Sequence, residues 1–224
     1  MGLNREFKTL TEMFDVVTKE FLETKRPAFL RKIKGEWSTI TYSDYRNYVK
    51  NFSLGLSSIG VEKGDRIIII SENRIEWTIS DMSILIAGAI CVPVYPSLTA
   101  KQVEYIINNC EAKYIIVSNQ LQLSKINKIK ADLPTLKKVI IMNEKVEIEE
   151  NLIKFSDILR AGEKHAEKNP GLFEKMIHEP KPEDSATIIY TSGTTGDPKG
   201  VELTHNNFVF EIRGAAQLFD IKSS

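Results

Sequence analysis

The sequence predicts an α/β protein built on a doubly wound, mostly parallel sheet with flanking helices. Two observations predict this class. Strand-like and helix-like segments alternate between residues 45 and 143, as they do in consecutive βαβ units. Residues 67–70 are four consecutive isoleucines, which is typical of a strand covered by helices on both faces. An amino-terminal hairpin and a carboxy-terminal strand–loop–strand element are predicted outside this layer.

The first 44 residues are predicted to contain a helix and a hairpin. Apolar residues at helical spacing predict a helix over residues 10–22. Strands over residues 28–33 and 38–42 flank a short turn, which is typical of a hairpin. Trp37 and Trp77 stand at core-like positions, where packing explains them better than stacking on a ligand.

The parallel layer, residues 45–143, is predicted to begin with a helix. Ser43 is the expected N-cap, Asp44 adds a favourable charge to the first turn, and Gly60 ends the helix. Its predicted buried face consists of Tyr45, Tyr48, Val49, Phe52, Leu56 and Ile59. The elements that follow are predicted as strand 65–70, helix 75–86, strand 89–94, helix 99–109, strand 114–117, helix 123–133 and strand 139–142.

Residues 144–184 interrupt this alternation and are predicted to form a charged, mobile connector. They are rich in glutamate and lysine, contain three prolines, and include one predicted helix over residues 156–167. Residues 185–224 complete the chain with two strands around a loop and a last helix over residues 208–218, capped by Asn206 or Asn207. All four segments are assigned to one domain.

The loop between these two strands is dense in hydrogen-bond donors. From Tyr190 to Gly200 it contains five hydroxyl side chains, three glycines and one lysine. Backbone N–H groups approach phosphate oxygens closely where Cβ atoms are absent. The loop is therefore predicted to bind a polyphosphate. The alternative is an ordinary Gly/Ser/Thr turn, although common turns need only two to five residues.

A Walker A loop is excluded by residue order. That motif places Ser or Thr directly after its lysine, at the start of a helix. Here Lys199 stands between Pro198 and Gly200, and the segment that follows alternates like a strand. Pro198 also removes one backbone donor.

The balance of charge argues against binding of nucleic acid. Lysine plus arginine and aspartate plus glutamate both number 30, so the formal net charge is zero, whereas nucleic-acid binding needs a basic surplus. A local basic bias is explained by a solvated helix face, and the alternative is peripheral contact with anionic lipid. It comprises Lys125, Lys128, Lys130, Lys137 and Lys138.

The two cysteines, Cys91 and Cys110, stand in apolar contexts and form no C-x-x-C pair, so we expect buried free thiols in a reducing compartment. The longest apolar stretch, residues 84–94, is too short to span a bilayer. A cytoplasmic protein is predicted. His165 and His178 are expected in solvent, and His205 is expected to be structural or capping, with contact to a ligand as the alternative.

The loop resembles the phosphate-binding signature of the adenylate-forming (AMP-binding) superfamily, without gaps from Tyr190 to Val201. Residues 63–67 and 88–96 also resemble that family. Residues 196–201 and 203–207 look most like the amino-terminal part of long-chain fatty acid–CoA ligases, with Glu202 as a mild departure. The fold implied is an incomplete amino-terminal domain of such a ligase.

The resemblance implies an activity and its co-substrates. A fatty acid reacts with ATP to give acyl-adenylate and pyrophosphate, and CoA then displaces AMP, with Mg²⁺ neutralising the triphosphate. The residues implied to contact the β- and γ-phosphates are Tyr190, Thr191, Ser192, Gly193, Thr194, Thr195, Gly196, Asp197, Pro198, Lys199, Gly200 and Val201.

Catalytic residues of that family have no counterpart in this chain, so we expect an amino-terminal piece that is inactive alone. Exposed surfaces of such a piece are expected to give a homo-oligomer, and the loop is expected to be mobile without nucleotide. Two alternatives stay open: a ligase for a short-chain, aryl or amino acid, and a non-catalytic module that binds nucleotide.

Overall fold

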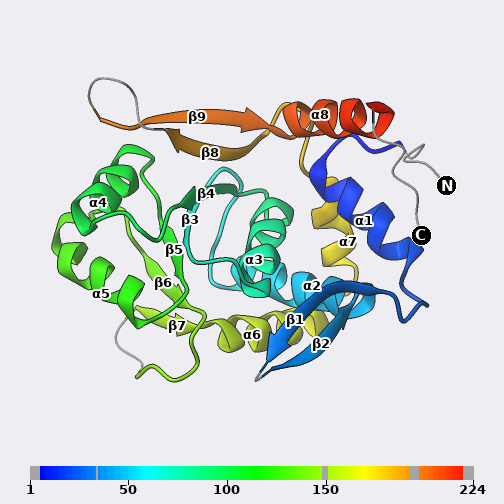
Figure 1. Ribbon diagram of the computed structural model, residues 1–224, viewed down its shortest axis with the longest axis horizontal. Coiled ribbons are helices and arrows are strands. Elements are labelled where there is room, and N and C mark those ends of the chain that lie inside the picture. The colour runs from blue at the N-terminus through cyan, green and yellow to red at the C-terminus, as the bar shows by residue number, and fades with distance from the viewer. Residues whose placement is uncertain (1–5, 34, 148–150, 192–196, 219–224) are drawn as a thin grey trace.

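The computed structural model describes residues 6–33, 35–147, 151–191 and 197–218. Its main feature is a seven-stranded sheet with the order β7-β6-β5-β3-β4-β8-β9 (Figure 1). All neighbouring strands are parallel except β8 and β9, which pair antiparallel. The predicted doubly wound, mostly parallel α/β class is confirmed.

The parallel strands are β3 (Arg66–Ile70), β4 (Ile90–Val94), β5 (Tyr114–Val117), β6 (Lys138–Ile141), β7 (Leu152–Lys154) and β8 (Ser185–Thr191). The last strand of the sheet is β9 (Lys199–Thr204). A separate hairpin consists of β1 (Pro27–Ile33) and β2 (Glu36–Thr41).

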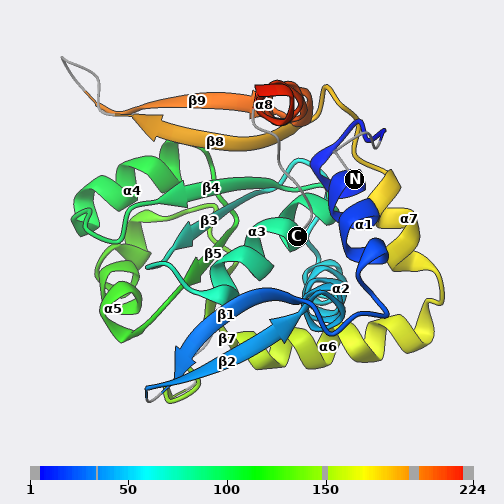
Figure 2. The same cartoon turned by 45° about the vertical axis from the view of Figure 1, so that its right-hand side comes forward.

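Helices cover both faces of the sheet (Figure 2). One face carries α1 (Leu10–Glu20), α2 (Tyr42–Ser58), α3 (Ile75–Ile86), α6 (Phe155–Lys168) and α7 (Leu172–His178). The other face carries α4 (Ala100–Asn109) and α5 (Gln120–Ile129), which is followed by the short 3₁₀ helix η1 (Lys130–Asp132). The last helix is α8 (His205–Leu218).

The isoleucine run explains why the sheet is covered twice. Ile67 and Ile69 pack into the core beneath α2, α3 and α6, whereas Ile68 and Ile70 pack into the core beneath α4 and α5. All four side chains are fully buried. Successive residues of a strand point to opposite faces, so a continuous apolar strand needs a helical layer on each side.

The N-cap expected at Ser43 is wrong, because the helix begins two residues earlier. Thr41 is the N-cap of α2: its hydroxyl accepts a hydrogen bond from the Asp44 N–H at 3.1 Å, and the Asp44 carboxylate accepts one from the Thr41 N–H at 2.9 Å. The two bonds form a capping box that satisfies two free donors at once. Asp44 therefore does stabilise the first turn, but through this box.

Two predictions of burial are also wrong. Tyr48 on α2 is 39% exposed and Trp37 is 68% exposed. The Trp37 ring lies on a two-stranded hairpin, where Lys32 Nζ stands 6.0 Å from the ring centroid. Trp77, as predicted, packs against the main core.

The connector with a single helix is wrong as well. Residues 152–178 contain β7, which extends the sheet, α6 and α7. The two glycines Gly55 and Gly162 allow α2 and α6 to approach closely, because a Cβ on Gly162 would lie 1.7 Å from the carbonyl oxygen of Asn51. This segment is part of the packed layer, with the Phe52 and Phe155 rings stacked at 4.3 Å.

Candidate functional site

The predicted phosphate loop lies at the end of an antiparallel arm formed by β8 and β9 (Figures 1 and 2). Thr191 pairs with Lys199 in the last register position of the arm. Five of the predicted site residues, Ser192, Gly193, Thr194, Thr195 and Gly196, lie outside the described residues. Of the remaining seven, Tyr190 and Thr191 end β8, Asp197 and Pro198 precede β9, and Lys199, Gly200 and Val201 begin β9, as the sequence predicts for a strand–loop–strand element.

The base of the arm is attached to the parallel sheet. Cys91 and Thr187 are the paired residues of β4 and β8, and the Thr187 hydroxyl donates to the Cys91 carbonyl at 2.7 Å. Lys63 donates to the Asp184 carboxylate at 2.6 Å. Burial opposes ionisation of Asp184, but its hydrogen bond with Lys63 lowers the net pKa of this carboxyl. The strand β8 thus starts from a fixed position.

His205 belongs to this base and has a structural role. It is 2% exposed, and its Nδ1 accepts a hydrogen bond from the Leu10 N–H at 3.3 Å. Burial lowers the pKa of His205 to about 4, so the ring is neutral near pH 7. The cap of α8 is instead a reciprocal pair: Thr204 donates its N–H to Asn207 Oδ1 at 2.8 Å, and the Asn207 N–H donates to the Thr204 hydroxyl.

The far end of the arm is open to solvent. Thr191, Asp197, Lys199, Gly200 and Val201 are exposed, and Pro198 is half-buried. Lys199 therefore presents its ammonium where an anionic ligand can reach it. A groove separates this end from α4, and its lining is Lys101, Gln102, Glu104, Tyr105, Asn108, Asn109, Asp197 and Pro198.

Tyr190 differs from its neighbours because its side chain is half-buried. Its hydroxyl donates a hydrogen bond to the side-chain oxygen Oδ1 of Asn109 at 2.5 Å. Asn109 is the last residue of α4. Burial raises the pKa of Tyr190, so the phenol keeps its proton. This contact connects the arm to a helix that lies far away in the sequence.

A second polar group lies at the carboxyl ends of β3 and β5 and was missed by the sequence reasoning. Arg74 donates to Glu76 at 2.8 Å and to the carbonyl of Ser118 at 3.3 Å, and Asn119 donates to Glu72 at 3.3 Å. Open α/β sheets bind ligands at this edge. The available signal was the polar run Ser-Glu-Asn-Arg directly after the isoleucine strand.

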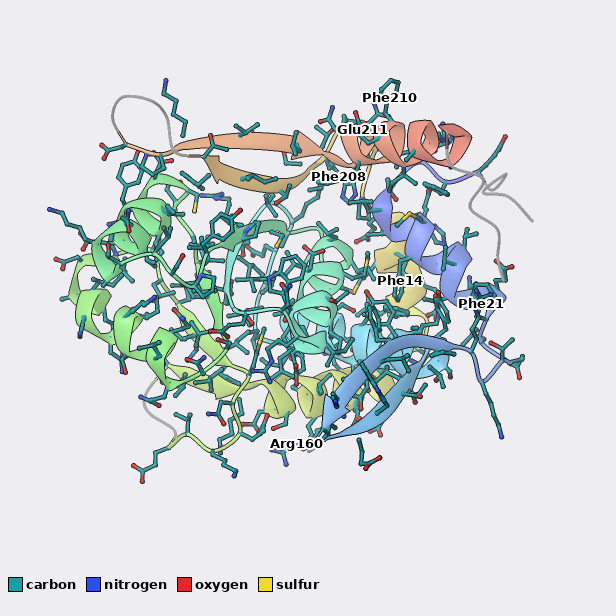
Figure 3. All side chains as sticks on the ribbon, in the orientation of Figure 1. Phe14, Phe21, Arg160, Phe208, Phe210 and Glu211 are labelled. Carbon is teal, nitrogen blue, oxygen red and sulfur yellow. The ribbon has the colours of Figure 1, made fainter. Side chains whose placement is uncertain are left out.

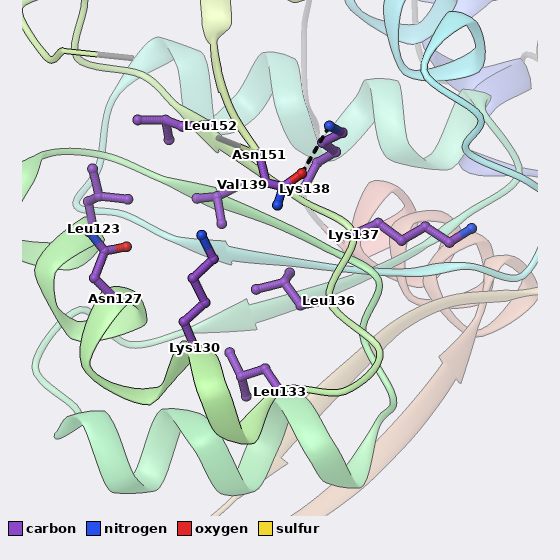
Figure 4. Close-up of a pocket in the computed structure, with 10 residues that line it drawn as sticks. All are labelled: Leu123, Asn127, Lys130, Leu133, Leu136, Lys137, Lys138, Val139, Asn151 and Leu152. Atoms are coloured by element: carbon purple, nitrogen blue, oxygen red, sulfur yellow. Dashed lines mark hydrogen bonds between the residues drawn. The ribbon is translucent and has the colours of Figure 1, made fainter. Parts of the chain in front are cut away.

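The local group of lysines on α5 and near β6 is partly explained by internal contacts. Lys125 donates to the carbonyls of Pro96 and Leu98 at 2.6 and 2.8 Å. Lys138 donates to Asn151 at 3.2 Å beside a small pocket (Figure 4). Leu123, Leu133, Leu136, Val139 and Leu152 supply the apolar part of the lining.

In the described part of the chain, no three His, Cys, Asp or Glu residues gather as a metal site. Within the same ranges, no helix combines the length and the apolar character that crossing a bilayer requires. Cys91 and Cys110 are free and buried, as expected.

The parallel sheet with its terminal arm is an architecture found in solved ligases. An anthranilate–CoA ligase, AuaEII, crystallised with anthranoyl-AMP, matches with a TM-score of 0.72 and 24% identity, over 89% of this chain and 36% of that one. A putative long-chain-fatty-acid CoA ligase from Rhodopseudomonas palustris matches with a TM-score of 0.74 and 20% identity, over 96% and 49%. At these identities the likeness concerns the fold.

The sequence defines the family. Residues 22–222 match the AMP-binding enzymes, and this chain belongs to that family. The long-chain-fatty-acid–CoA ligase FadD15 of Mycobacterium bovis is 35% identical over 84% of this chain and 30% of its own length. The long-chain-fatty-acid–CoA ligase ACSBG1 of Rattus norvegicus is 31% identical over 96% and 29%. The chain thus spans less than a third of these relatives.

Proposed function

We propose that this chain forms the phosphate-binding part of an ATP-dependent fatty acid–CoA ligase. In the proposed reaction, the carboxylate of a fatty acid attacks the α-phosphorus of ATP, and pyrophosphate leaves. The thiol of CoA then displaces AMP from the acyl-adenylate. The observation that carries the proposal is the β8–β9 arm, which holds a donor-rich loop between two strands. The names of the relatives support fatty acids as the substrate class.

The proposed role of residues 190–201 is to orient the β- and γ-phosphates. Negative charge grows on pyrophosphate as it leaves, and donors fixed around it stabilise that charge. Lys199 adds one positive charge, but Asp197 offsets it, so the loop is neutral. A triphosphate carries roughly four negative charges, which one lysine does not balance. We therefore propose that Mg²⁺ enters with the nucleotide and supplies the remaining neutralisation.

A titration with MgATP tests the nucleotide site. We expect the 224-residue chain to bind MgATP, and we expect Lys199→Ala to weaken binding about tenfold, because a charge-assisted contact to phosphate is lost. Lys32→Ala, on the distant β1–β2 hairpin, is the matched control and should leave binding unchanged. Failure of the unmodified chain to bind MgATP would remove the support for this role.

A panel of acids tests the substrate class. The protein that carries this chain is supplied with ATP and CoA, and pyrophosphate release is followed with long-chain, short-chain, aryl and amino acids. Long-chain acids are expected to react fastest. A cytoplasmic location is also proposed, supported by the two buried free thiols. Faster reaction with an aryl or amino acid would overturn the proposed fatty acid substrate, while the proposed adenylation reaction would stand.

A further inference from the structure

Tyr190 is the last half-buried side chain of β8 before the phosphate loop, and its position is determined from outside the arm. Its ring packs against the core formed by α4, α5 and the parallel strands, next to Ile188 on the same face of β8. Its hydroxyl reaches Asn109 at the end of α4. Beyond Thr187, no residue of β8 is paired with β4 in the described structure. Contacts of the Tyr190 side chain therefore connect this end of the arm to the body of the protein.

The end of α4 is itself well anchored. Arg66, the first residue of β3, donates to the carbonyl of Cys110 at 2.6 Å and to that of Gly64 at 3.2 Å. Asn108, which precedes Asn109, donates to the carbonyl of Asp132 at 3.0 Å. Asn109 is thus an acceptor held by the central strand and by the segment after α5.

Gly200 provides an independent observation, because it faces Tyr190 across the arm. The two residues are partners in the β8–β9 register. A Cβ on Gly200 would lie 2.8 Å from Ile188 Cγ2 and 3.1 Å from Tyr190 Cζ. Gly200 is absent from the described glycines with positive φ, so its backbone conformation does not require glycine. The close approach of the Ile188 and Tyr190 side chains does.

We propose that Tyr190 and Asn109 form a latch that positions the loop-bearing end of the β8–β9 arm against α4, with Gly200 as the space that the Ile188 and Tyr190 side chains need. This inference rests on the proposed function, because it assigns a positioning role for the same loop. Tyr190 then acts through its side chain, as a positioning residue on the arm. The missing side chain of Gly200 leaves room for the Tyr190 ring, in addition to any role in letting phosphate approach the backbone.

Hydrogen exchange tests the latch without any nucleotide. In the 224-residue chain, Tyr190→Phe and Asn109→Ala should each speed amide exchange in residues 186–191 and 199–204 about threefold, as loss of one hydrogen bond predicts. The double variant should exchange no faster than either single variant, because both remove the same bond. Gly200→Ala should also speed exchange, because its Cβ displaces the Ile188 and Tyr190 side chains.

Two controls separate positioning from general destabilisation. Asn109→Asp keeps an oxygen acceptor for the phenol and should restore exchange to the unmodified rate. Ser124→Ala removes a hydrogen bond within α5, from the Ser124 hydroxyl to the Gln120 carbonyl, and should leave the arm unchanged. Unchanged exchange in Tyr190→Phe and Asn109→Ala would overturn the latch, as would an equal effect of Ser124→Ala.

Binding of MgATP supplies the second readout. If the unmodified chain binds MgATP, the latch variants should weaken binding about threefold, and Asn109→Asp should not. Unaltered affinity in Tyr190→Phe and Asn109→Ala would refute the positioning role. If the unmodified chain does not bind MgATP, the proposed function fails, while the exchange data still decide whether the latch holds the arm.

Discussion

The close contact between α2 and α6 predicts that any side chain at Gly162 destabilises the fold. Alanine at this position would place a Cβ 1.7 Å from the Asn51 carbonyl oxygen, 2.6 Å from its carbon and 2.8 Å from the Gly55 nitrogen. All three atoms belong to the backbone, so no side-chain rotation relieves the overlap. The helices would have to separate by more than about 1 Å to reach normal contact distances.

Two effects of opposite sign decide the magnitude. Replacing glycine by alanine inside a helix favours folding by about 1 kcal/mol. Forcing packed elements apart costs about 1–3 kcal/mol and occasionally more. Here the separation also loosens the stacked Phe52 and Phe155 rings and the fully buried Ile158. A backbone overlap of this size lies at the upper end of that range, about 3 kcal/mol, so after the helix-propensity gain we expect a net loss of about 2 kcal/mol for Gly162→Ala.

Urea unfolding of the 224-residue chain, followed by circular dichroism, measures this difference. The matched control is Gly214→Ala on α8, where an added Cβ meets no heavy atom within 4 Å. This control should gain about 0.5–1 kcal/mol from helix propensity alone. Stability of Gly162→Ala equal to or above that of the unmodified chain would show that α6 does not pack on α2 as described.

Three further predictions concern charge and surface. Because the pKa of His205 is about 4 in the fold and about 6.5 when unfolded, the unfolded state takes up the proton first; stability should fall by about 3 kcal/mol as pH drops from 7.5 to 4. Urea midpoints across pH test this: His205→Asn should flatten the slope, and an unchanged slope in that variant would contradict it. Arg46 donates to Thr18 and Asp15 at 2.7 Å in a buried cluster in which Lys19 also pairs with Asp15, so Arg46→Met should cost about 1.5–3 kcal/mol in urea, and near-neutral stability would refute that role. We propose self-association through exposed apolar side chains, among them Phe210 on the outer side of α8, 74% exposed (Figure 3). Sedimentation should show an assembly that Phe210→Ser weakens, whereas a monomer at high concentration would count against it.

Local patterns were sufficient for most elements of the parallel layer. The boundaries of α3 and β5 agree with the predicted ranges 75–86 and 114–117. Periodicity is strong there because each side chain faces either a core or solvent, with few exceptions. The start of α2 was misplaced because Thr41 and Ser43 are both good caps, and only the reciprocal bond with Asp44 selects between them.

Short elements carry too little pattern to be recognised. β7 has three residues and α7 has seven, and α7 follows a proline and a glycine, which are typical of a loop. Both elements form because the existing sheet and the α1–α2 layer offer surfaces to cover. Their stability is tertiary, which explains why residues 144–184 were mistaken for a connector.

The order of residues in the loop already indicated the family, because the run from Tyr190 to Val201 resembles the family signature without gaps and residues 22–222 match that family. Contacts between distant segments needed the folded chain. Tyr190 and Asn109 are 81 positions apart, and Gly162 meets Asn51 across two helices. No periodicity encodes such pairs, because their distance depends on how whole layers pack. A short run of sequence can thus indicate the kind of site, whereas the position of that run in space depends on how the whole chain folds.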